Sequence, residues 1–474
     1  MERVGVLVVS YGSREAAIVE ALRKSEEYRV DLYIADRQRN PYNLARAKEH
    51  IVIPNLDVDR ILSFAEKFKG EIDFGIVGPE KPIIEGIRDI IEEKVGIPLI
   101  CPTKEFAIEG SKVAQRLLFQ EAVPEVNPRF RVFAPSDYPS VEEAKRDLVK
   151  WLDELDNMVA VKPDAPAAGK GVGVWGDHFT SREQIIEHFT SNYREGAVIV
   201  EEKLEGEESS FQALCDGKHL IPLPETRDYK RAFDGDRGPN TGGMGSYKDV
   251  GDCLPFMTRE DREREEEIVE RIFRRLKGRG RNPGLIGMPF YVAFMHTRDG
   301  PKILENNSRF GDPEILNIIP ILKEDFVEVC YRILEGNLRG VEVDDKATVA
   351  IYKVPPSYGG YMEAYPDRVR RDEVGSPINL EGAERLASLY QGRMRIYPAS
   401  VELRNGGIYA LRSRAVCVVG IGETIEEARR ISLEGIGAIR GGGLWNRMDI
   451  GSREHIDKSI AHLRRLRGFR PVER

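Results

Sequence analysis

The stretch VGVLVVSYGSREAA, residues 4–17, decides the class of fold. Its first six residues are apolar and mostly β-branched, as expected for a strand that is buried on both faces of a sheet. Small and polar residues follow, and a helical pattern then begins at Ala16. Further apolar runs at 32–35 and 74–77 repeat this arrangement of strand and helix, which predicts a parallel α/β sheet.

The carboxyl ends of these strands form the first candidate pocket, because ligands of open parallel sheets bind there. Residues Ser10 to Glu15 follow the first strand, and Gly78 to Glu80 follow the strand at 74–77. A helical pattern with apolar residues at positions 84, 87 and 91 comes next, and we predict one helix for it.

Length and composition exclude several classes of protein. The chain has 474 residues and a formal net charge of −8. This length corresponds to about three domains, and the acidity argues against a nucleic-acid partner. The five cysteines show no C-x-x-C spacing, so we expect free thiols in the cytoplasm. The apolar run at 4–9 is too short to span a membrane, so we expect no membrane partner.

The chain changes character twice after the first sheet. A helix begins at Gly110-Ser111-Lys112, and prolines 124 and 128 then break the chain. Strands at 131–133, 159–162 and 172–175 suit a small lid-like subdomain. We predict a solvated amphipathic helix over Thr258 to Lys277 and a separate α+β domain with short strands from about residue 340.

Two segments suit a nucleotide. Between Lys162 and Gly171, small residues let backbone N–H groups approach phosphate oxygens, and Lys162 adds a positive charge. A hairpin tip with a solvated Lys170 is the alternative. The acids from Glu201 to Glu208 follow an apolar strand, where they could hold adenine and ribose. A solvated acidic turn is the alternative there.

Two further segments suit a metal and an anionic substrate. Glu305 and Asn307 are two residues apart, so on a strand they face the same side, and their oxygens suit Mg²⁺. Arg309 could neutralise charge during phosphoryl transfer, and a structural Arg–Asp pair is the alternative. The segments 228–231 and 238–245 combine cations with glycines, as in an anion cradle or a plain Ω-loop.

In this order the segments resemble the glycinamide ribonucleotide synthetase (phosphoribosylamine–glycine ligase) family of the ATP-grasp superfamily. The most specific stretches are GPNTGGMG at 238–245 and NSRFGDPE at 307–314; AAGKG at 167–171 and EGSK at 109–112 add to them. The resemblance implies a multidomain α/β and α+β chain with the ATP-grasp fold. Its expected parts are an N-terminal Rossmann-like domain at 1–110, a central domain at 111–127 and 196–338, a mobile lid at 128–195, and a C-terminal α+β domain at 339–474.

The resemblance also implies an activity and roles for individual residues. Glycine would be ligated to 5-phosphoribosylamine through glycyl phosphate, with ATP as co-substrate and Mg²⁺ or Mn²⁺, in purine biosynthesis, by a monomer or weak homodimer. Catalysis would involve Lys162, Arg309 and Asp312, and Glu305 and Asn307 would bind the metal. ATP would contact Lys112, Lys162, Gly169, Lys170, Gly171, Glu201, Glu202, Leu204 and Glu208. The other substrates would contact Gly12, Ser13, Arg14, Glu15, Gly78, Pro79, Glu80, Asp228, Lys230, Asn240, Thr241, Gly242, Gly243, Met244, Arg309, Gly311, Pro313 and Glu314.

The first turn departs from the family pattern G-N-G-G-R-E-H-A. Here it reads SYGSREAA from Ser10 to Ala17, so Tyr11 adds bulk where the backbone should approach the substrate phosphate. Lys81 could supply a replacement cation. Two alternatives therefore stay open, a related ligase with a different amine or amino acid and a nucleotide-binding protein without activity.

Overall fold

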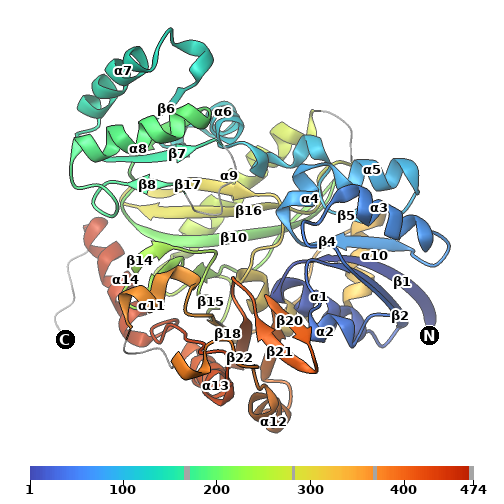
Figure 1. Cartoon of the computed structure of the whole chain (residues 1–474). Coiled ribbons are helices and arrows are strands. Elements are labelled where there is room, and N and C mark those ends of the chain that lie inside the picture. The colour runs from blue at the N-terminus through green and yellow to red at the C-terminus, as the bar shows by residue number, and fades with distance from the viewer. Residues whose placement is uncertain (165–170, 280–282, 367–370, 469–474) are drawn as a thin grey trace.

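Figure 1 shows the chain as a computed structural model, in which residues 1–164, 171–279, 283–366 and 371–468 are described. The N-terminal part is a five-stranded parallel sheet in the order β3-β2-β1-β4-β5. The strands are β1 (Glu2–Ser10), β2 (Tyr28–Asp36), β3 (Glu49–Val52), β4 (Phe74–Val77) and β5 (Leu99–Ile100). The prediction of a parallel α/β sheet is confirmed.

The central place of β1 explains its apolar sequence. Val6 and Val8 belong to one hydrophobic core, whereas Leu7 and Val9 belong to another, because successive side chains of a strand point to opposite faces. Both faces of β1 are therefore buried, as the run at 4–9 predicts.

Helices connect the strands of this sheet, and one expected helix is divided. They are α1 (Ser13–Arg23), α2 (Pro41–Leu44), α3 (Val58–Lys67), α4 (Glu80–Ile84) and α5 (Ile87–Lys94). The prediction of one helix through positions 84–91 is wrong. Gly86 has a φ of 87°, a left-handed conformation that a right-handed helix cannot continue through, so α4 ends before it and α5 begins after it.

The segment predicted to form the lid contains an antiparallel sheet in the order β6-β9-β7-β8, called the lid sheet below. Its elements are β6 (Phe130–Phe133), α7 (Val141–Glu154), β7 (Val159–Pro163), β8 (Gly173–Val174), α8 (Arg182–Glu195) and β9 (Val198–Glu202). Alternate valines of β7 and β9 share a core with α7 and α8, which lie on the sheet in Figure 1. The three strands predicted in this segment are present.

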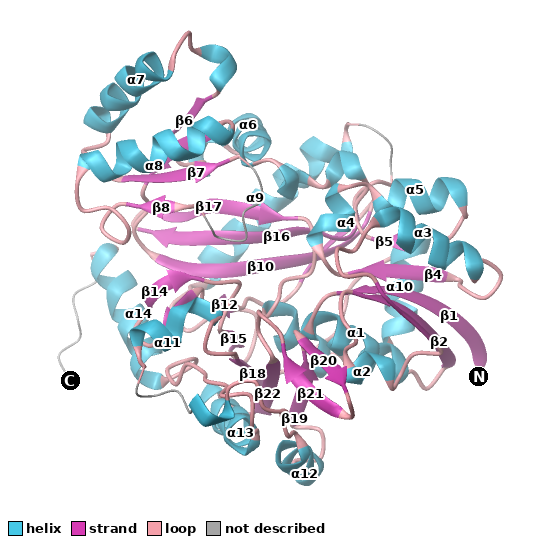
Figure 2. Cartoon of the chain, in the orientation of Figure 1, coloured by secondary structure: helices cyan, strands magenta, loops and turns pink. Residues whose placement is uncertain are grey.

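A second antiparallel sheet, in the order β11-β10-β16-β17, lies next to the lid sheet (Figure 2). Its strands are β10 (Glu207–Asp216), β11 (Leu220–Pro222), β16 (Ile286–Thr297) and β17 (Gly300–Asn307), and it packs against α6 (Lys112–Ala122) and α9 (Arg259–Lys277). The apolar stripe of α9 is buried as predicted. Its first turns are not solvated, because Asp261, Arg262 and Glu265 are buried in ion pairs with Arg467, Glu225 and His296.

The C-terminal part contributes most of a five-stranded sheet in the order β12-β15-β18-β22-β19. The strands are β12 (Arg227–Asp228), β15 (Gly245–Lys248), β18 (Ala347–Lys353), β19 (Met394–Pro398) and β22 (Val416–Gly422). β12 and β15 flank the predicted anion cradle and belong to the same sheet as β18, β19 and β22. Strands of the C-terminal part therefore hold that segment in place.

Two hairpins and five further helices complete the described part of the C-terminal half. The hairpins are β13 (Arg231–Phe233) with β14 (Arg237–Asn240) and β20 (Val401–Arg404) with β21 (Gly407–Ala410); the helices are α10 (Phe326–Glu335), α11 (Tyr361–Ala364), α12 (Glu381–Leu389), α13 (Ile425–Ala438) and α14 (Arg453–Leu466). Within the described ranges, none of the helices has the length and apolar character that a membrane crossing requires.

Candidate active site

A pocket brings together predicted residues from four elements that are distant in sequence. It is lined by Lys112, Gln115 and Arg116 of α6, Lys162 of β7, Glu201 of β9, and Leu304 and Glu305 of β17. Two predicted phosphate lysines therefore lie beside the predicted metal-binding glutamate. Two other predicted ATP residues, Gly169 and Lys170, lie outside the described residues.

Glu201 is paired with two cations in the wall of this pocket. Its side chain contacts Lys162 Nζ and lies 2.7 Å from Arg116 Nε, and the residue is 2% exposed. Burial alone would raise the pKa of Glu201, but the charges of Arg116 and Lys162 outweigh it and hold the pKa below its usual value. The pocket therefore contains an ionised carboxylate between fixed positive charges.

Arg116 was missed by the sequence reasoning. Its guanidinium also donates to the carbonyl oxygens of Ile303 (3.2 Å) and Leu304 (2.5 Å), so it joins α6 to β17 beside Glu201. One signal could have found it. Arg116 lies four residues after Lys112, and side chains with this spacing share one face of a helix.

The other predicted ATP residues differ in their surroundings. Glu202 pairs with Arg129 (3.2 Å) and Lys302 (3.5 Å) and does not line the pocket, since adjacent residues of β9 face opposite sides. Leu204 lies in the connection between β9 and β10, and Glu208 in β10. Gly171 has a φ of 88°, which favours glycine.

The two residues predicted to bind the metal lie together on one strand. Glu305 and Asn307 are two apart on β17, so they face one side of the strand. Burial would raise the pKa of Glu305, but the charges of Lys230, Lys162 and Lys112 lower it. One carboxylate and one amide oxygen fit a divalent cation that takes its remaining ligands from phosphates. No group of three or more His, Cys, Asp or Glu suited to a metal occurs among the described residues.

Arg309 lies between two acids at the end of β17. Its Nε is 3.3 Å from Glu80 Oε2 and 3.3 Å from Glu109 Oε1, and it is not aligned with any hydrogen-bond acceptor in the described residues. Burial would lower the pKa of Arg309, but the charges of Glu109 and Glu80 raise it. Asp312 is not its partner, because Asp312 pairs with Arg414. Glu109, which the sequence reasoning did not place in the site, also accepts from the backbone N–H of Ser308 (3.0 Å).

Two carboxylates predicted to contact the substrate each have one buried oxygen without a partner among the described residues. Glu314 Oε1 accepts from Tyr291 and Ser210, but Glu314 Oε2 and Asp228 Oδ1 have no hydrogen-bond partner there. Burial and the charge of Glu314 raise the pKa of Asp228 well above its usual value. A buried polar atom without a partner is costly, so these oxygens suit a cationic group of a ligand.

Lys230, predicted to contact the substrate, pairs with Glu208, predicted to contact ATP. Its Nζ lies 3.2 Å from Glu208 Oε2, and the charges of Glu208, Glu305 and Asp228 raise its pKa against the effect of burial. We expected Lys230 on the substrate side and Glu208 on the nucleotide side, and the structure brings them into contact.

Most polar groups of the first turn bind other groups of the same turn. Glu15 Oε2 accepts from the N–H groups of Tyr11 (3.2 Å) and Gly12 (2.8 Å). Arg14 Nε lies 2.6 Å from Glu15 Oε1, and Arg14 also donates to the carbonyl oxygen of Phe310 (2.9 Å). A side chain at Gly78 would lie 1.8 Å from Glu15 Oε1, so this position needs glycine. Arg14 and Glu15 are both buried and therefore have structural contacts in this turn.

The predicted anion cradle is held by the C-terminal part. Arg414 Nη1 donates to the carbonyl oxygens of Gly242 (2.8 Å) and Gly243 (3.3 Å), and Gly242 N–H donates to Tyr358 Oη (2.9 Å). Thr241 Oγ1 donates to the Lys230 carbonyl at 2.9 Å. Arg414 and Tyr358 were missed, because they lie outside every motif segment.

The positions of the remaining residues predicted to contact the substrates are as follows. Asn240 ends β14, Met244 is fully buried beside β15, and Pro79 caps α4. A side chain at Gly311 would lie 2.8 Å from Glu314 Oε2, and Pro313 follows a cis peptide bond.

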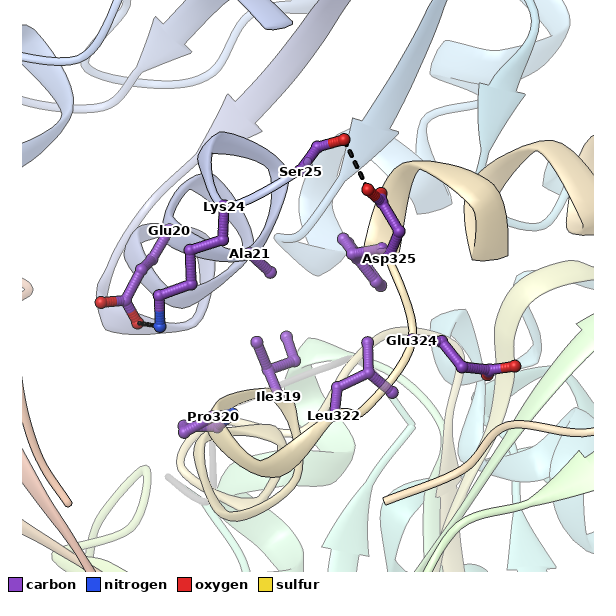
Figure 3. Close-up of a pocket in the computed structure, with 10 residues that line it drawn as sticks. Glu20, Ala21, Lys24, Ser25, Ile319, Pro320, Leu322, Glu324 and Asp325 are labelled. Atoms are coloured by element: carbon purple, nitrogen blue, oxygen red, sulfur yellow. Dashed lines mark hydrogen bonds and ion pairs between the residues drawn. The ribbon is translucent and has the colours of Figure 1, made fainter. Parts of the chain in front are cut away.

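A second pocket lies away from this cleft, between the end of α1 and the start of α10 (Figure 3). Glu20 and Lys24 form an ion pair of 3.4 Å on one side of it, and Ser25 Oγ donates to Asp325 Oδ2 at 2.5 Å. None of the residues lining it belongs to the predicted site.

Comparisons with known proteins show which family the chain resembles over nearly its whole length. Residues 4–109 match the family model described as "Phosphoribosylglycinamide synthetase, N domain", and residues 129–315 match its "ATP-grasp (A) domain". A phosphoribosylamine–glycine ligase of Methanocella arvoryzae is 37% identical, with 98% of this chain and 100% of that protein covered. Another, of Pyrococcus furiosus, is 38% identical with 98% of each covered. A solved phosphoribosylamine–glycine ligase of Thermotoga maritima superposes with a TM-score of 0.69 at 26% identity and covers 94% of this chain and 100% of its own.

Proposed function

The chain belongs to the phosphoribosylamine–glycine ligase family, and from this membership we propose how its residues divide the reaction. The enzyme is a ligase of purine biosynthesis that joins glycine to 5-phosphoribosylamine and converts ATP to ADP and phosphate. The glycine carboxylate attacks the γ-phosphorus of ATP, and ADP leaves with the electrons of the broken P–O bond. The amine then attacks the carbonyl carbon of glycyl phosphate, and phosphate leaves.

The pocket around Glu201 is the proposed nucleotide site. Lys112 and Lys162 hold the phosphates, Glu201 and the Leu204 backbone hold adenine, and Glu208 holds ribose. The convergence of Lys112, Lys162 and Glu305 on this pocket is the observation that carries the proposal. Glu305 and Asn307 would hold Mg²⁺ or Mn²⁺, and such an ion neutralises charge on the phosphates when it is bound.

The turn after β17 and the two open carboxylates form the proposed glycine site. Arg309 stabilises the negative charge of the transferred phosphoryl group, because its Nε is not aligned with either neighbouring acid. Asp228 Oδ1 and Glu314 Oε2 hold the glycine ammonium, since both are buried oxygens without a partner. The ammonium thereby fixes the carboxylate for attack.

The proposed phosphoribosylamine site lies at the carboxyl ends of β1 and β4 and along residues 240–244. The Glu15 carboxylate occupies the N–H groups of Tyr11 and Gly12, so the substrate phosphate would need other donors of this region. The four buried thiols and the one partly buried thiol suit a protein of the reducing cytoplasm. We also propose that the protein is a monomer or weak homodimer.

The test is ADP release by the purified protein with ATP and Mg²⁺, with glycine and freshly generated 5-phosphoribosylamine added separately and together. We expect turnover that requires both and that is lost in Glu305→Ala. Turnover with glycine and a different amine, but none with 5-phosphoribosylamine, would instead support a related ligase.

A further inference from the structure

The hydroxyl of Tyr352 joins two substrate-side segments that are far apart in the chain. Tyr352 lies in β18 and is fully buried, and its hydroxyl is hydrogen-bonded to the Ser13 hydroxyl and to Asp312 Oδ1. Ser13 begins α1 after the first turn, whereas Asp312 belongs to the turn after β17. A strand of the C-terminal part therefore supplies the contact between them.

The two ends of this contact are anchored unequally. Arg414 holds Asp312 a second time, with Nη2 3.2 Å from Oδ2 and with a hydrogen bond of 2.8 Å to the Asp312 carbonyl. The Ser13 hydroxyl has Tyr352 as its one side-chain partner within the described ranges. Removal of the Tyr352 hydroxyl would therefore free the Ser13 end of the first turn and leave Asp312 in place, while Arg14 keeps its hydrogen bond to the Phe310 carbonyl.

Ser13 and Tyr352 together bring the first turn against Asp312, and a side chain at Gly12 would lie 3.5 Å from Asp312 Oδ2.

We propose that Tyr352 is a positioning residue that sets the distance between the first turn and the turn at 311–314, so that the amine reaches the acyl phosphate. The proposal rests on the proposed function, which places the amine substrate at the first turn. Neither partner of the hydroxyl lines the nucleotide pocket, and Arg414 still holds Asp312 in the turn of the proposed glycine site. Loss of the hydroxyl should therefore affect the amine step and spare phosphoryl transfer. A displacement of about 1 Å between reacting groups can cost about 100-fold in rate.

The experiment compares two reactions of full-length Tyr352→Phe. The first is complete ligation with 5-phosphoribosylamine. The second is ADP formation from ATP and glycine with hydroxylamine, which traps the acyl phosphate without the natural amine. We expect kcat/KM for 5-phosphoribosylamine to fall about 10- to 100-fold, and the hydroxylamine reaction to stay within about twofold of the unsubstituted enzyme. An unchanged kcat/KM, or a parallel fall in both reactions, would overturn the proposal.

Tyr397→Phe is the matched control. Tyr397 is also fully buried in this sheet, in β19, and its hydroxyl donates to Glu20 Oε2 at 2.6 Å, away from the cleft. Tyr397→Phe removes the same hydroxyl oxygen, and the rates of both reactions should stay unchanged.

Ser13→Ala tests the other end of the contact without a change in the buried ring. It should reproduce the loss in the amine step, and the double variant should be no worse than Tyr352→Phe alone, because that change already removes the bond between Ser13 and Tyr352. Additive losses would overturn the proposal. Failure of the proposed function is separate, since it would appear in the unsubstituted enzyme as no glycine-dependent ADP formation with either amine.

Discussion

Two arginines in motif segments, the buried Arg14 and the partly exposed Arg309, have different surroundings. Arg14 is 2% exposed, and its guanidinium is used by Glu15 Oε1 and the Phe310 carbonyl. The Arg309 side chain is 18% exposed and lies between Glu80 and Glu109. Its Nη1 also donates to the Phe310 carbonyl (3.2 Å), but within the described residues its Nε has no hydrogen-bond acceptor. A match to a motif therefore does not separate an arginine that holds the fold from one that is available to a substrate. The hydrogen bonds that each already makes do separate them.

The largest expected effect is on stability, in Arg14→Met. This change leaves Glu15 buried without its cation, and removal of one partner from a buried ion pair costs about 3–5 kcal/mol. Denaturant unfolding of the variant and the unsubstituted protein measures the loss. A loss below about 1 kcal/mol would be typical of a surface ion pair. It would contradict the conclusion that Arg14, unlike Arg309, holds the fold.

Arg309→Met should act on turnover. Loss of one donor to the transition state typically lowers kcat about 100- to 1,000-fold, and steady-state ADP release measures it. The free energy of unfolding should fall less than in Arg14→Met, because the Arg309 side chain is 18% exposed against 2% for Arg14, and Glu80, one of its two acids, is 39% exposed and can be solvated. If kcat is unchanged while stability falls, Arg309 is a structural residue like Arg14.

His296, a third side chain that lies beside acids, extends the comparison to the pH dependence of stability. Burial would lower its pKa, but Glu265 and Asp261 outweigh burial and raise it to about 9. A folded-state pKa above the unfolded value of about 6.5 stabilises the fold below pH 6.5, and this contribution is lost as the pH rises through 9. We expect the free energy of unfolding to fall by about 1–3 kcal/mol over this range.

His296→Gln is the control for that experiment. Glutamine cannot gain a proton, so this variant should be less stable at pH 6.5 and should show a smaller fall between pH 6.5 and 9. Equal slopes in both proteins would show that His296 does not hold its proton in the folded state.

The smallest expected effect separates two neighbouring acids of β9. Glu201→Gln removes the charge between Arg116 and Lys162 and should raise the KM for ATP, whereas Glu202→Gln should leave it within about twofold. Glu202 makes partly exposed ion pairs, each worth about 0–1 kcal/mol of stability. An equal rise in KM for both would mean that the two carboxylates face the nucleotide together.

The local sequence predicted many elements of this fold and most of its polar segments. Apolar runs identified β1, β2 and β4, because strands buried on both faces need continuous apolar sequence. The spacing of Glu305 and Asn307 predicted that they share one face of a strand, and both lie on β17. The sequence reasoning missed β3, which has no fully buried residue, and the break at Gly86, which depends on one backbone angle.

By itself the sequence determined which segments carry charge and small residues, because these properties belong to residues that are close in the chain. It did not determine which charges neutralise one another. That Arg116 pairs with Glu201, that Asp312 pairs with Arg414, and that Tyr352 joins the first turn to Asp312 follows from contacts between distant segments. Only the tertiary structure decides such pairings, since the energy of a charge depends on its distance to the others and on its exposure to water.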